Sequence, residues 1–120
     1  LIIGPESRGF VFGLPISYKL KIGFAMARKK GKLPGKVNSK TYALEYNTAT
    51  IEVPFDSIKK GDRVVLVDDL LATGGTLKAL TQLVEEAGAE VVGVVTLIEL
   101  KELEGFRVLE GVPYRSLLRL

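Results

Sequence analysis

The chain has 120 residues, of which 47% are hydrophobic and 26% charged, and its formal net charge is +3. This length fits one domain that buries roughly two-thirds of its unfolded surface. With no Cys and no His, disulfides, thiolate chemistry and a Ser-His-Asp triad are excluded, and any metal must bind oxygen ligands, as Mg²⁺ prefers. We expect a cytoplasmic protein, because no apolar run could span a membrane and no signal-peptide pattern opens the chain. The modest charge suits a small polyanion at least as well as a nucleic acid.

The first predicted elements are a buried strand, Leu1–Ile3, and a helix from about Phe10 to Leu20 with Pro15 in its first turns. The loop between them, Gly4–Gly9, would lie at the carboxyl end of the strand, where open α/β sheets bind ligands. Its glycines give the backbone freedom, and Arg8 offers a planar fork for phosphate. An ordinary turn with a solvated Arg8 fits this spacing equally well.

A second strand, Phe24–Ala27, completes a strand–helix–strand unit and leads into a basic, glycine-punctuated run, Arg28–Lys36. Three interpretations of this run compete. It could be a solvated charged loop, a nucleic-acid patch, or a pyrophosphate-binding segment at the same sheet edge as the first loop. A nucleic-acid patch would be expected to contain interleaved aromatic residues, which this single short cluster lacks.

Two β-rich runs, Tyr42–Tyr46 and Ala49–Val53, flank Asn47-Thr48 and predict a hairpin over about residues 40–53. Such a two-stranded flap could close over a site and exclude water. The alternative is a purely structural hairpin, which is the commoner context for a lone Glu such as Glu45.

The most informative stretch begins with Val64–Val67, an unbroken branched apolar run typical of a strand buried on both faces. Asp68 and Asp69 follow at the predicted end of this strand. As hydrogen-bond acceptors they would repel a phosphate, and they are better suited to the hydroxyl groups of a nearby ribose. An Asp that caps the next helix is the simpler alternative.

A loop with two glycines and two threonines separates these carboxylates from a predicted helix whose apolar face runs from Leu77 to Ala87. Gly74 and Gly75 would let the backbone take a positive φ and approach an anion closely. Amides at the helix N-terminus, together with the hydroxyls of Thr73 and Thr76, would then bind phosphate.

The rest of the chain predicts a buried strand over Val91–Ile98, a connector over Gly105–Gly111 and a last strand over Val112–Leu118. The whole pattern predicts an α/β fold. Its sheet should be mainly parallel, Rossmann-like and flanked by helices, with the flap hairpin beside it.

Four separate segments resemble adenine phosphoribosyltransferases, within the type I phosphoribosyltransferase family. Asp68–Thr76 resembles the phosphoribosyl pyrophosphate motif, and Glu6–Phe10 resembles the pyrophosphate loop. Arg28–Pro34 is similar to the basic segment of these enzymes, and Ser39–Tyr46 to their flexible catalytic loop. Because the segments occur in the family's order, the resemblance covers nearly the whole chain and implies the type I phosphoribosyltransferase fold.

The resemblance implies a role for each segment. Glu45 would be catalytic, handling a proton of the purine imidazole ring, and Leu100 would lie beside the purine. A cis peptide bond between Glu6 and Ser7, a homodimer, and Mg²⁺ carried by the substrate rather than by protein ligands are also implied. The other implied contacts are Ala72, Thr73, Gly74, Gly75 and Thr76 to the 5′-phosphate, Asp68 and Asp69 to the ribose, and Glu6, Ser7, Arg8, Arg28 and Lys29 to pyrophosphate. Those of Glu6, Ser7 and Arg8 would be made by their backbone.

The implied function is purine salvage, by transfer of the 5-phosphoribosyl group from phosphoribosyl pyrophosphate to adenine, which gives AMP and pyrophosphate. Two alternatives stay open: the same chemistry on another 6-substituted purine, and a non-catalytic domain that senses phosphoribosyl pyrophosphate or a nucleotide. The chain begins inside its first predicted strand, so we expect the N-terminal hood that covers the purine in this family to be absent. We therefore expect binding of phosphoribosyl pyrophosphate with Mg²⁺, but poor adenine turnover and weak discrimination among purines.

Overall fold

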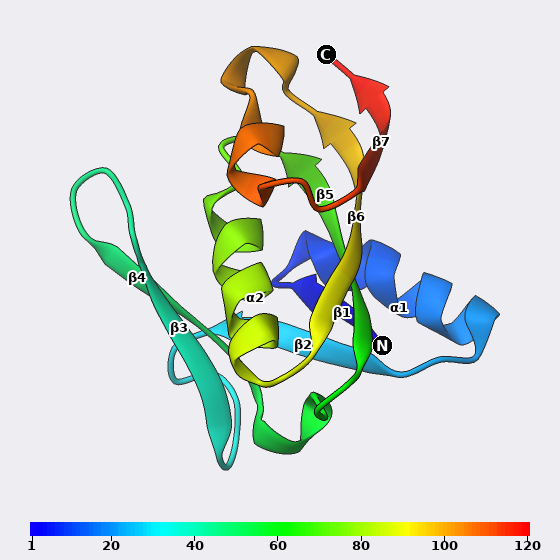
Figure 1. Cartoon of the computed structure of the whole chain (residues 1–120), viewed down its shortest axis with the longest axis vertical. Helices are drawn as coiled ribbons and strands as arrows, with labels where there is room; N and C mark the ends of the chain where they lie inside the picture. The colour runs from blue at the N-terminus through cyan, green and yellow to red at the C-terminus, as the bar shows by residue number, and fades with distance from the viewer.

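The structure is a computed structural model of residues 1–120, and it forms a seven-stranded sheet with two α-helices and three short 3-10 helices (Figure 1). The strands are β1 (Ile2–Pro5), β2 (Phe24–Lys29), β3 (Val37–Ala43), β4 (Thr48–Pro54), β5 (Arg63–Leu71), β6 (Glu90–Glu99) and β7 (Tyr114–Arg119). The helices are α1 (Arg8–Leu20) and α2 (Gly75–Glu86), and the 3-10 helices are η1 (Phe55–Ser57), η2 (Lys101–Leu103) and η3 (Gly105–Leu109).

The sheet is mainly parallel, as the sequence predicted. Its strand order is β3-β4-β2-β1-β5-β6-β7, and the five strands from β2 to β7 in that order are parallel to one another. Strand β4 pairs antiparallel with both β2 and β3, which makes the flap hairpin an extension of the sheet. The carboxyl ends of the parallel strands therefore meet at one edge, the ligand-binding edge of open α/β sheets.

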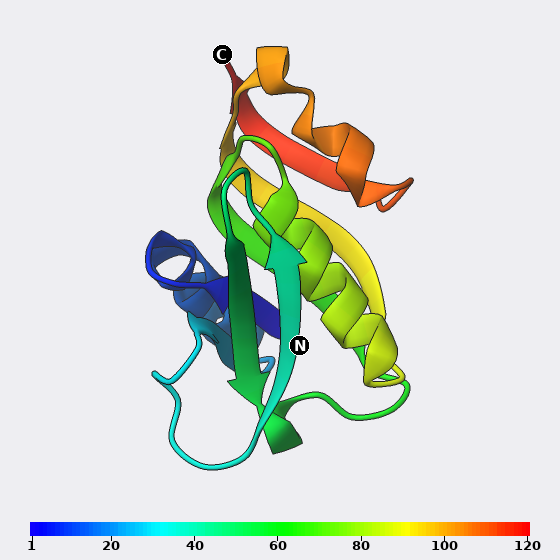
Figure 2. The ribbon, with the colours of Figure 1, turned by 90° about the vertical axis from the view of Figure 1, so that its left-hand side faces the viewer.

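The two α-helices cover opposite faces of the sheet, as Figures 1 and 2 show. Helix α2 buries an apolar face that includes Leu77, Leu80 and Leu83. These side chains join a core cluster of 17 buried residues that includes Leu66 and Val94 of the sheet. Burying each such side chain contributes about 1.5–3 kcal/mol, so this packing fixes α2 and the loop that precedes it.

Helix α1 packs closely because it buries only small residues: Gly9, Gly13 and Ser17. A Cβ at Gly9 would lie 2.9 Å from the carbonyl oxygen of Val67, and one at Gly4 would lie 2.7 Å from the carbonyl oxygen of Gly9. Neither Gly4 nor Gly9 has a positive φ. Our interpretation of these glycines as sources of backbone freedom was therefore wrong, since they are needed for space between the loop, α1 and β5.

Helix α1 also begins earlier than predicted, at Arg8, so Pro15 is the eighth of its 13 residues rather than part of its first turns. A proline at this position removes the hydrogen bond to the carbonyl of Val11, four residues before it. Val11 is 63% exposed, so water can bind that carbonyl and the helix continues through the proline.

Strand β5 is longer than its apolar run. It continues through Asp68 and Asp69 to Leu71, because β6 pairs with it along this length, from Asp68 opposite Thr96 to Leu71 opposite Glu99. The prediction that the two aspartates follow the strand was wrong. Backbone pairing with β6 places both aspartates within β5, just before the candidate phosphate loop.

The predicted C-terminal connector contains η3, and the last strand, β7, pairs in parallel with β6. Neither this segment nor any other part of the chain forms a helix with the length and apolar character needed to cross a membrane.

Candidate functional site

Three loops meet at the carboxyl edge of the sheet because their strands are neighbours in the order β2-β1-β5. The loop after β1 contains Glu6 and Ser7, the end of β2 contains Arg28 and Lys29, and the loop after β5 runs over residues 72–74. The structure thus brings together the predicted pyrophosphate, ribose and 5′-phosphate residues at one edge.

The loop after β5 leads directly into the N-terminus of α2. Gly74 is in the left-handed region, with φ 84°, and α2 begins at Gly75. No hydrogen bond occupies the backbone N–H groups of Gly75, Thr76 or Leu77. Free amides at a helix N-terminus attract an anion, so this loop has the geometry predicted for phosphate binding. Gly75, however, has no positive φ, so only Gly74 needs the conformation expected of both glycines.

Helix η3 packs against the other side of this loop, a contact that the sequence did not predict. A Cβ on Gly74 would lie 2.5 Å from Cγ2 of Val108 and 2.8 Å from the carbonyl oxygen of Gly105. A Cβ on Gly105 would lie 2.2 Å from the carbonyl oxygen of Ala72. The loop is therefore held between α2 and η3 and has no room for a side chain at Gly74.

The two aspartates of β5 have different electrostatic states. Burial raises the pKa of Asp68 to about 7, and the neighbouring Asp69 charge adds to this effect. Burial also acts on Asp69, but its ion pair with the Arg8 guanidinium outweighs burial and lowers the pKa of Asp69 below its ordinary value. Asp68 also accepts a hydrogen bond of 2.8 Å from the Asp69 backbone N–H. The pair thus offers one charged and one readily protonated carboxyl to a ligand.

The pyrophosphate-loop candidates surround this pair. The peptide bond between Glu6 and Ser7 is cis, which confirms the prediction from family resemblance. Ser7 and Arg8 are exposed, Arg28 is half-buried and Lys29 is exposed, so their polar groups are accessible at the sheet edge. The predicted pyrophosphate and ribose residues meet in the Arg8–Asp69 ion pair.

The flap differs from its predicted form. Its strands are β3 and β4, so the turn covers residues 44–47 rather than Asn47-Thr48, and Glu45 lies on the turn instead of in a strand. Glu45 is exposed and makes no side-chain hydrogen bond or ion pair. In Figure 1 the turn stands clear of the loop before α2. The structure does not bring Glu45 together with the other predicted site residues.

The body of the flap nevertheless contacts the phosphate loop. The hydroxyl of Tyr42 lies 3.1 Å from the hydroxyl of Thr76, and Lys40 forms an ion pair with Glu86 of α2. Sequence analysis gave Tyr42 no role, because a contact across 34 residues leaves no local signal. A cavity of about 310 Å³ lies between the flap and the first turns of α2, lined by Thr41, Tyr42, Ala43, Gly75, Lys78, Ala79 and Gln82.

Leu100 lies at the same edge of the sheet. Its backbone N–H donates a 2.9 Å hydrogen bond to the carbonyl of Leu71, the last residue of β5. Its side chain is half-buried. Leu100 is therefore next to the strand that carries the aspartates, on the side of β6.

No cluster of three or more acidic, histidine or cysteine side chains occurs in the chain. The two aspartates of β5 offer carboxylate oxygens beside the candidate phosphate loop, and Arg8 engages one of them. Mg²⁺ needs near-octahedral oxygen coordination and is commonly held by one or two carboxylates plus substrate phosphates. These residues fit a Mg²⁺ ion that is bound largely by a phosphate-bearing ligand.

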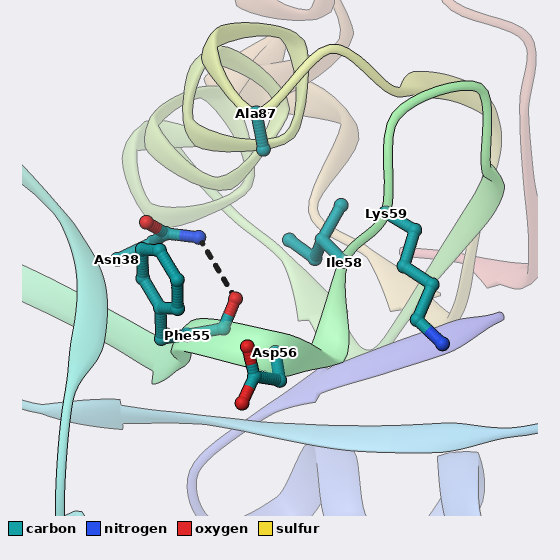
Figure 3. Close-up of a pocket in the computed structure, with 6 residues that line it drawn as sticks. All are labelled: Asn38, Phe55, Asp56, Ile58, Lys59 and Ala87. Atoms are coloured by element: carbon teal, nitrogen blue, oxygen red, sulfur yellow. Dashed lines mark hydrogen bonds between the residues drawn. The ribbon is translucent and has the colours of Figure 1, made fainter.

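A larger cavity, of about 490 Å³, lies elsewhere. Figure 3 shows its lining residues: Asn38, Phe55, Asp56, Ile58, Lys59 and Ala87. Ala87 follows the C-terminus of α2, whereas the phosphate loop is at the N-terminus, a helix length of about 18 Å away. The amide of Asn38 already donates to the carbonyl of Phe55, at 3.5 Å. This cavity is therefore separate from the phosphate, ribose and pyrophosphate residues.

Comparison with known proteins gives consistent results. The phosphoribosyl transferase domain family matches residues 1–109. An adenine phosphoribosyltransferase from Desulfitobacterium hafniense is 55% identical over 119 residues, which are 99% of this chain and 69% of that protein. The crystal structure of adenine phosphoribosyltransferase from Thermoanaerobacter pseudethanolicus is 47% identical with a TM-score of 0.95, and the match covers 99% of this chain and 69% of that one.

A third relative was solved with ligands. The adenine phosphoribosyltransferase from Saccharomyces cerevisiae, in complex with an imino-altritol bisphosphate and adenine, is 39% identical with a TM-score of 0.91. The match covers 98% of this chain and 66% of the yeast chain.

Proposed function

This chain belongs to the phosphoribosyltransferase family, and we propose that it transfers the 5-phosphoribosyl group of phosphoribosyl pyrophosphate to adenine, giving AMP and pyrophosphate in purine salvage. The observation that carries this proposal is the meeting of three sites at one sheet edge. These are the free amides at the start of α2, the aspartate pair of β5, and the basic groups after β1 and β2. Together they could bind a phosphate, a ribose and a pyrophosphate.

The 5′-phosphate binds to the loop over Ala72–Thr76. Its oxygens accept hydrogen bonds from the amides at the start of α2 and from the hydroxyls of Thr73 and Thr76, and the helix dipole adds to this attraction. Because η3 and α2 hold the loop on both sides, the phosphate is fixed and C1′ of the ribose is oriented for reaction.

The aspartates of β5 bind the ribose hydroxyl groups. As the bond from C1′ to pyrophosphate breaks, positive charge develops on the sugar and negative charge on the leaving group. The carboxylates of Asp68 and Asp69 stabilise the first, while Arg8, Arg28 and Lys29 stabilise the second. The Arg8–Asp69 ion pair, which brings a basic residue of one group into contact with an acidic residue of the other, supports this assignment.

Glu45 handles the proton of the purine imidazole ring, while Leu100 lies against the purine. Glu45 is on the exposed flap turn, so the flap must close over the loop for Glu45 to reach the purine. A bound Mg²⁺ would neutralise charge on the pyrophosphate, and Asp68 and Asp69 are the residues that would help to hold it near the ribose.

We also propose a cytoplasmic homodimer. Four large apolar side chains on or beside α1 are more than half exposed: Val11, Leu14, Tyr18 and Leu20. Burying them against a second copy would remove this apolar surface from water. Sedimentation velocity should show a dimer that Leu14→Glu dissociates, and a monomeric wild-type protein would contradict the proposal.

An AMP-formation assay tests the function. With phosphoribosyl pyrophosphate, Mg²⁺ and adenine, AMP and pyrophosphate should form in equal amounts, and chelation of Mg²⁺ should stop the reaction. Parallel reactions with hypoxanthine and guanine test the preference for adenine over other 6-substituted purines. Tight binding of phosphoribosyl pyrophosphate without turnover of any purine would instead identify a sensing domain.

A further inference from the structure

One carboxylate lies among the cations of the proposed pyrophosphate site. The side chain of Glu6 is only 10% exposed, and its Oε2 accepts a 2.8 Å hydrogen bond from Nζ of Lys32. Its Oε1 accepts a 2.7 Å hydrogen bond from the backbone N–H of Lys29 and lies 3.4 Å from Nε of Arg28. Burial opposes ionisation, but the contacts with Lys32, Lys29 and Arg28 outweigh it and lower the pKa of Glu6 below its ordinary value.

The first consequence concerns the backbone. Strands β1 and β2 pair only as far as Pro5 opposite Ala27, and the N–H of Glu6 then donates to the carbonyl of Ala27 at 2.8 Å. Beyond this point β2 has no β1 partner, and the Glu6 side chain accepts the hydrogen bond from Lys29 instead. The carboxylate thus continues the ladder by one residue and fixes the basic end of β2.

The second consequence concerns the guanidinium of Arg28. Its Nε is buried and makes no hydrogen bond, so the ion pair with Glu6 is the contact that orients this atom. The terminal nitrogens of Arg28 make no hydrogen bond to the protein. Holding the buried end of the guanidinium leaves its terminal donors free for a ligand, in the fork geometry that suits phosphate.

We propose that Glu6 is a positioning residue for the pyrophosphate group, acting through Arg28 and the backbone at the end of β2. A carboxylate would repel pyrophosphate, so Glu6 acts by holding the groups that bind it. This inference rests on the proposed function, and it gives the side chain of Glu6 a role separate from its backbone in the pyrophosphate loop.

The proposal is tested by whether removing the charge of Glu6 strengthens or weakens the binding of pyrophosphate. Glu6→Gln keeps the size of the side chain and removes its charge. If Glu6 were a bystander, losing a negative charge beside the site would strengthen the binding of pyrophosphate. If it positions the cations, pyrophosphate should bind roughly tenfold more weakly, the change that corresponds to about 1.4 kcal/mol.

Titration calorimetry with pyrophosphate and Mg²⁺ would measure this effect on the full chain. AMP has no pyrophosphate group, so its affinity for Glu6→Gln should stay at the wild-type value, which also shows that the variant is folded. In turnover, kcat/KM for phosphoribosyl pyrophosphate should fall while the thermal midpoint stays within a few degrees of wild type. In an Arg28→Met background, the loss caused by Glu6→Gln should shrink, because the residue acts largely through Arg28.

Glu52→Gln is the matched control. The carboxylate of Glu52 is also buried, and it accepts a 3.0 Å hydrogen bond from the N–H of Gly31 in the same basic segment. It forms no ion pair with a cationic side chain. Its substitution should leave pyrophosphate affinity within about twofold, since a hydrogen bond to one backbone amide remains possible for Gln.

Three outcomes would overturn the inference. They are unchanged or tighter pyrophosphate binding by Glu6→Gln, an equal loss of AMP binding, and a full-sized effect in the Arg28→Met background. If the wild-type chain binds AMP and pyrophosphate, these results count against the role of Glu6 alone. If it binds neither, the proposed function fails, and the role of Glu6 fails with it.

Discussion

The loop over Ala72–Thr76 and the flap turn over residues 44–47 both belong to the proposed site, yet they are built in opposite ways. The loop is held between α2 and η3, so tightly that Gly74 has no room for a Cβ. The flap turn is exposed, and no ion pair or side-chain hydrogen bond holds Glu45. The proposed phosphate-binding loop is therefore held in place by its neighbours, whereas Glu45 could take up its proposed role in proton transfer only if the flap closed.

The largest expected effect concerns the exposed flap turn. Glu45→Gln should lower turnover by about 10²–10⁴-fold, the usual contribution of a general acid or base. The affinity for AMP and the thermal midpoint should stay near wild type, because Glu45 is exposed and its side chain makes no hydrogen bond or ion pair. Steady-state kinetics and calorimetry would measure both.

Glu104→Gln is a suitable control for Glu45→Gln. Glu104 is also exposed, but it pairs with Arg107 away from the flap. Near-normal turnover by Glu45→Gln would reduce Glu45 to a hairpin residue and leave the flap without a catalytic group.

Gly74→Val tests the closely packed loop over Ala72–Thr76. A side chain there would have to adopt φ 84° and displace Val108 and the Gly105 carbonyl. Strain of this kind costs about 1–3 kcal/mol, so AMP should bind roughly 10- to 100-fold more weakly and the protein should also be less stable. Equilibrium binding of AMP and thermal denaturation would report the two effects.

Gly61→Val is a control that introduces the backbone strain of a positive φ without a steric clash. Gly61 has φ 89°, but a Cβ there would meet nothing within 4 Å. It should lose some stability and keep its affinity for AMP. Wild-type AMP binding by Gly74→Val would show that the loop adapts, and the contrast with the flap would disappear.

The sequence predicted the rigid loop better than the flap, and the reason is physical. Gly74 at the start of an amphipathic helix is a local signal, because neighbouring residues in the sequence determine both the turn and the apolar face of the helix. The position of Asp68 and Asp69 within β5 depends on pairing with β6, about 28 residues later, which an apolar run cannot reveal. Likewise, the closeness of Gly105 and Val108 to Gly74 leaves no trace in the local pattern.

The flap turn was misplaced for a related reason. Asn47-Thr48 is an acceptable turn sequence, but the hairpin register is set by the pairing of β4 with β2, where Glu52 lies opposite Arg28. Ile51 and Val53 then point into the core, and the turn falls at residues 44–47. The contacts of the Glu6 side chain were also missed, because motif resemblance assigned that residue a backbone role.

The third prediction concerns the aspartate pair beside the rigid loop. With a pKa raised to about 7, Asp68 keeps its proton in the folded state between about pH 4 and 7, where the unfolded chain has lost it. The free energy of unfolding should therefore fall as pH rises through this range, and Asp68→Asn should remove that slope. Because water reaches part of the carboxyl, we expect on the order of 1–2 kcal/mol in total.

Denaturant unfolding of wild type and Asp68→Asn from pH 4 to 8 would measure this slope. Asp69 affects stability in a different pH range. Because its pKa is lowered in the folded state, it stabilises the fold at any pH above its ordinary pKa, and this stability is lost only as the solution becomes more acidic. Parallel pH profiles for wild type and Asp68→Asn would mean that folding leaves the pKa of Asp68 at its ordinary value.

The smallest expected effect concerns the contact between the flap and the phosphate loop. The hydroxyls of Tyr42 and Thr76 are 3.1 Å apart, and Thr76 can still accept this hydrogen bond while donating to a phosphate. Tyr42→Phe should cost about 0.5–1.5 kcal/mol of flap docking and change AMP affinity by no more than about threefold. Hydrogen exchange at the amides of β3 should become faster, while exchange in α2 stays the same.

Lys40→Met, which removes the ion pair with Glu86, should have a similar or smaller effect because that pair is partly exposed. If Tyr42→Phe instead reduced turnover as strongly as Glu45→Gln, the flap and the phosphate loop would act as one preformed unit. The proposed role of Glu45 would then depend on this fixed contact rather than on flap closure.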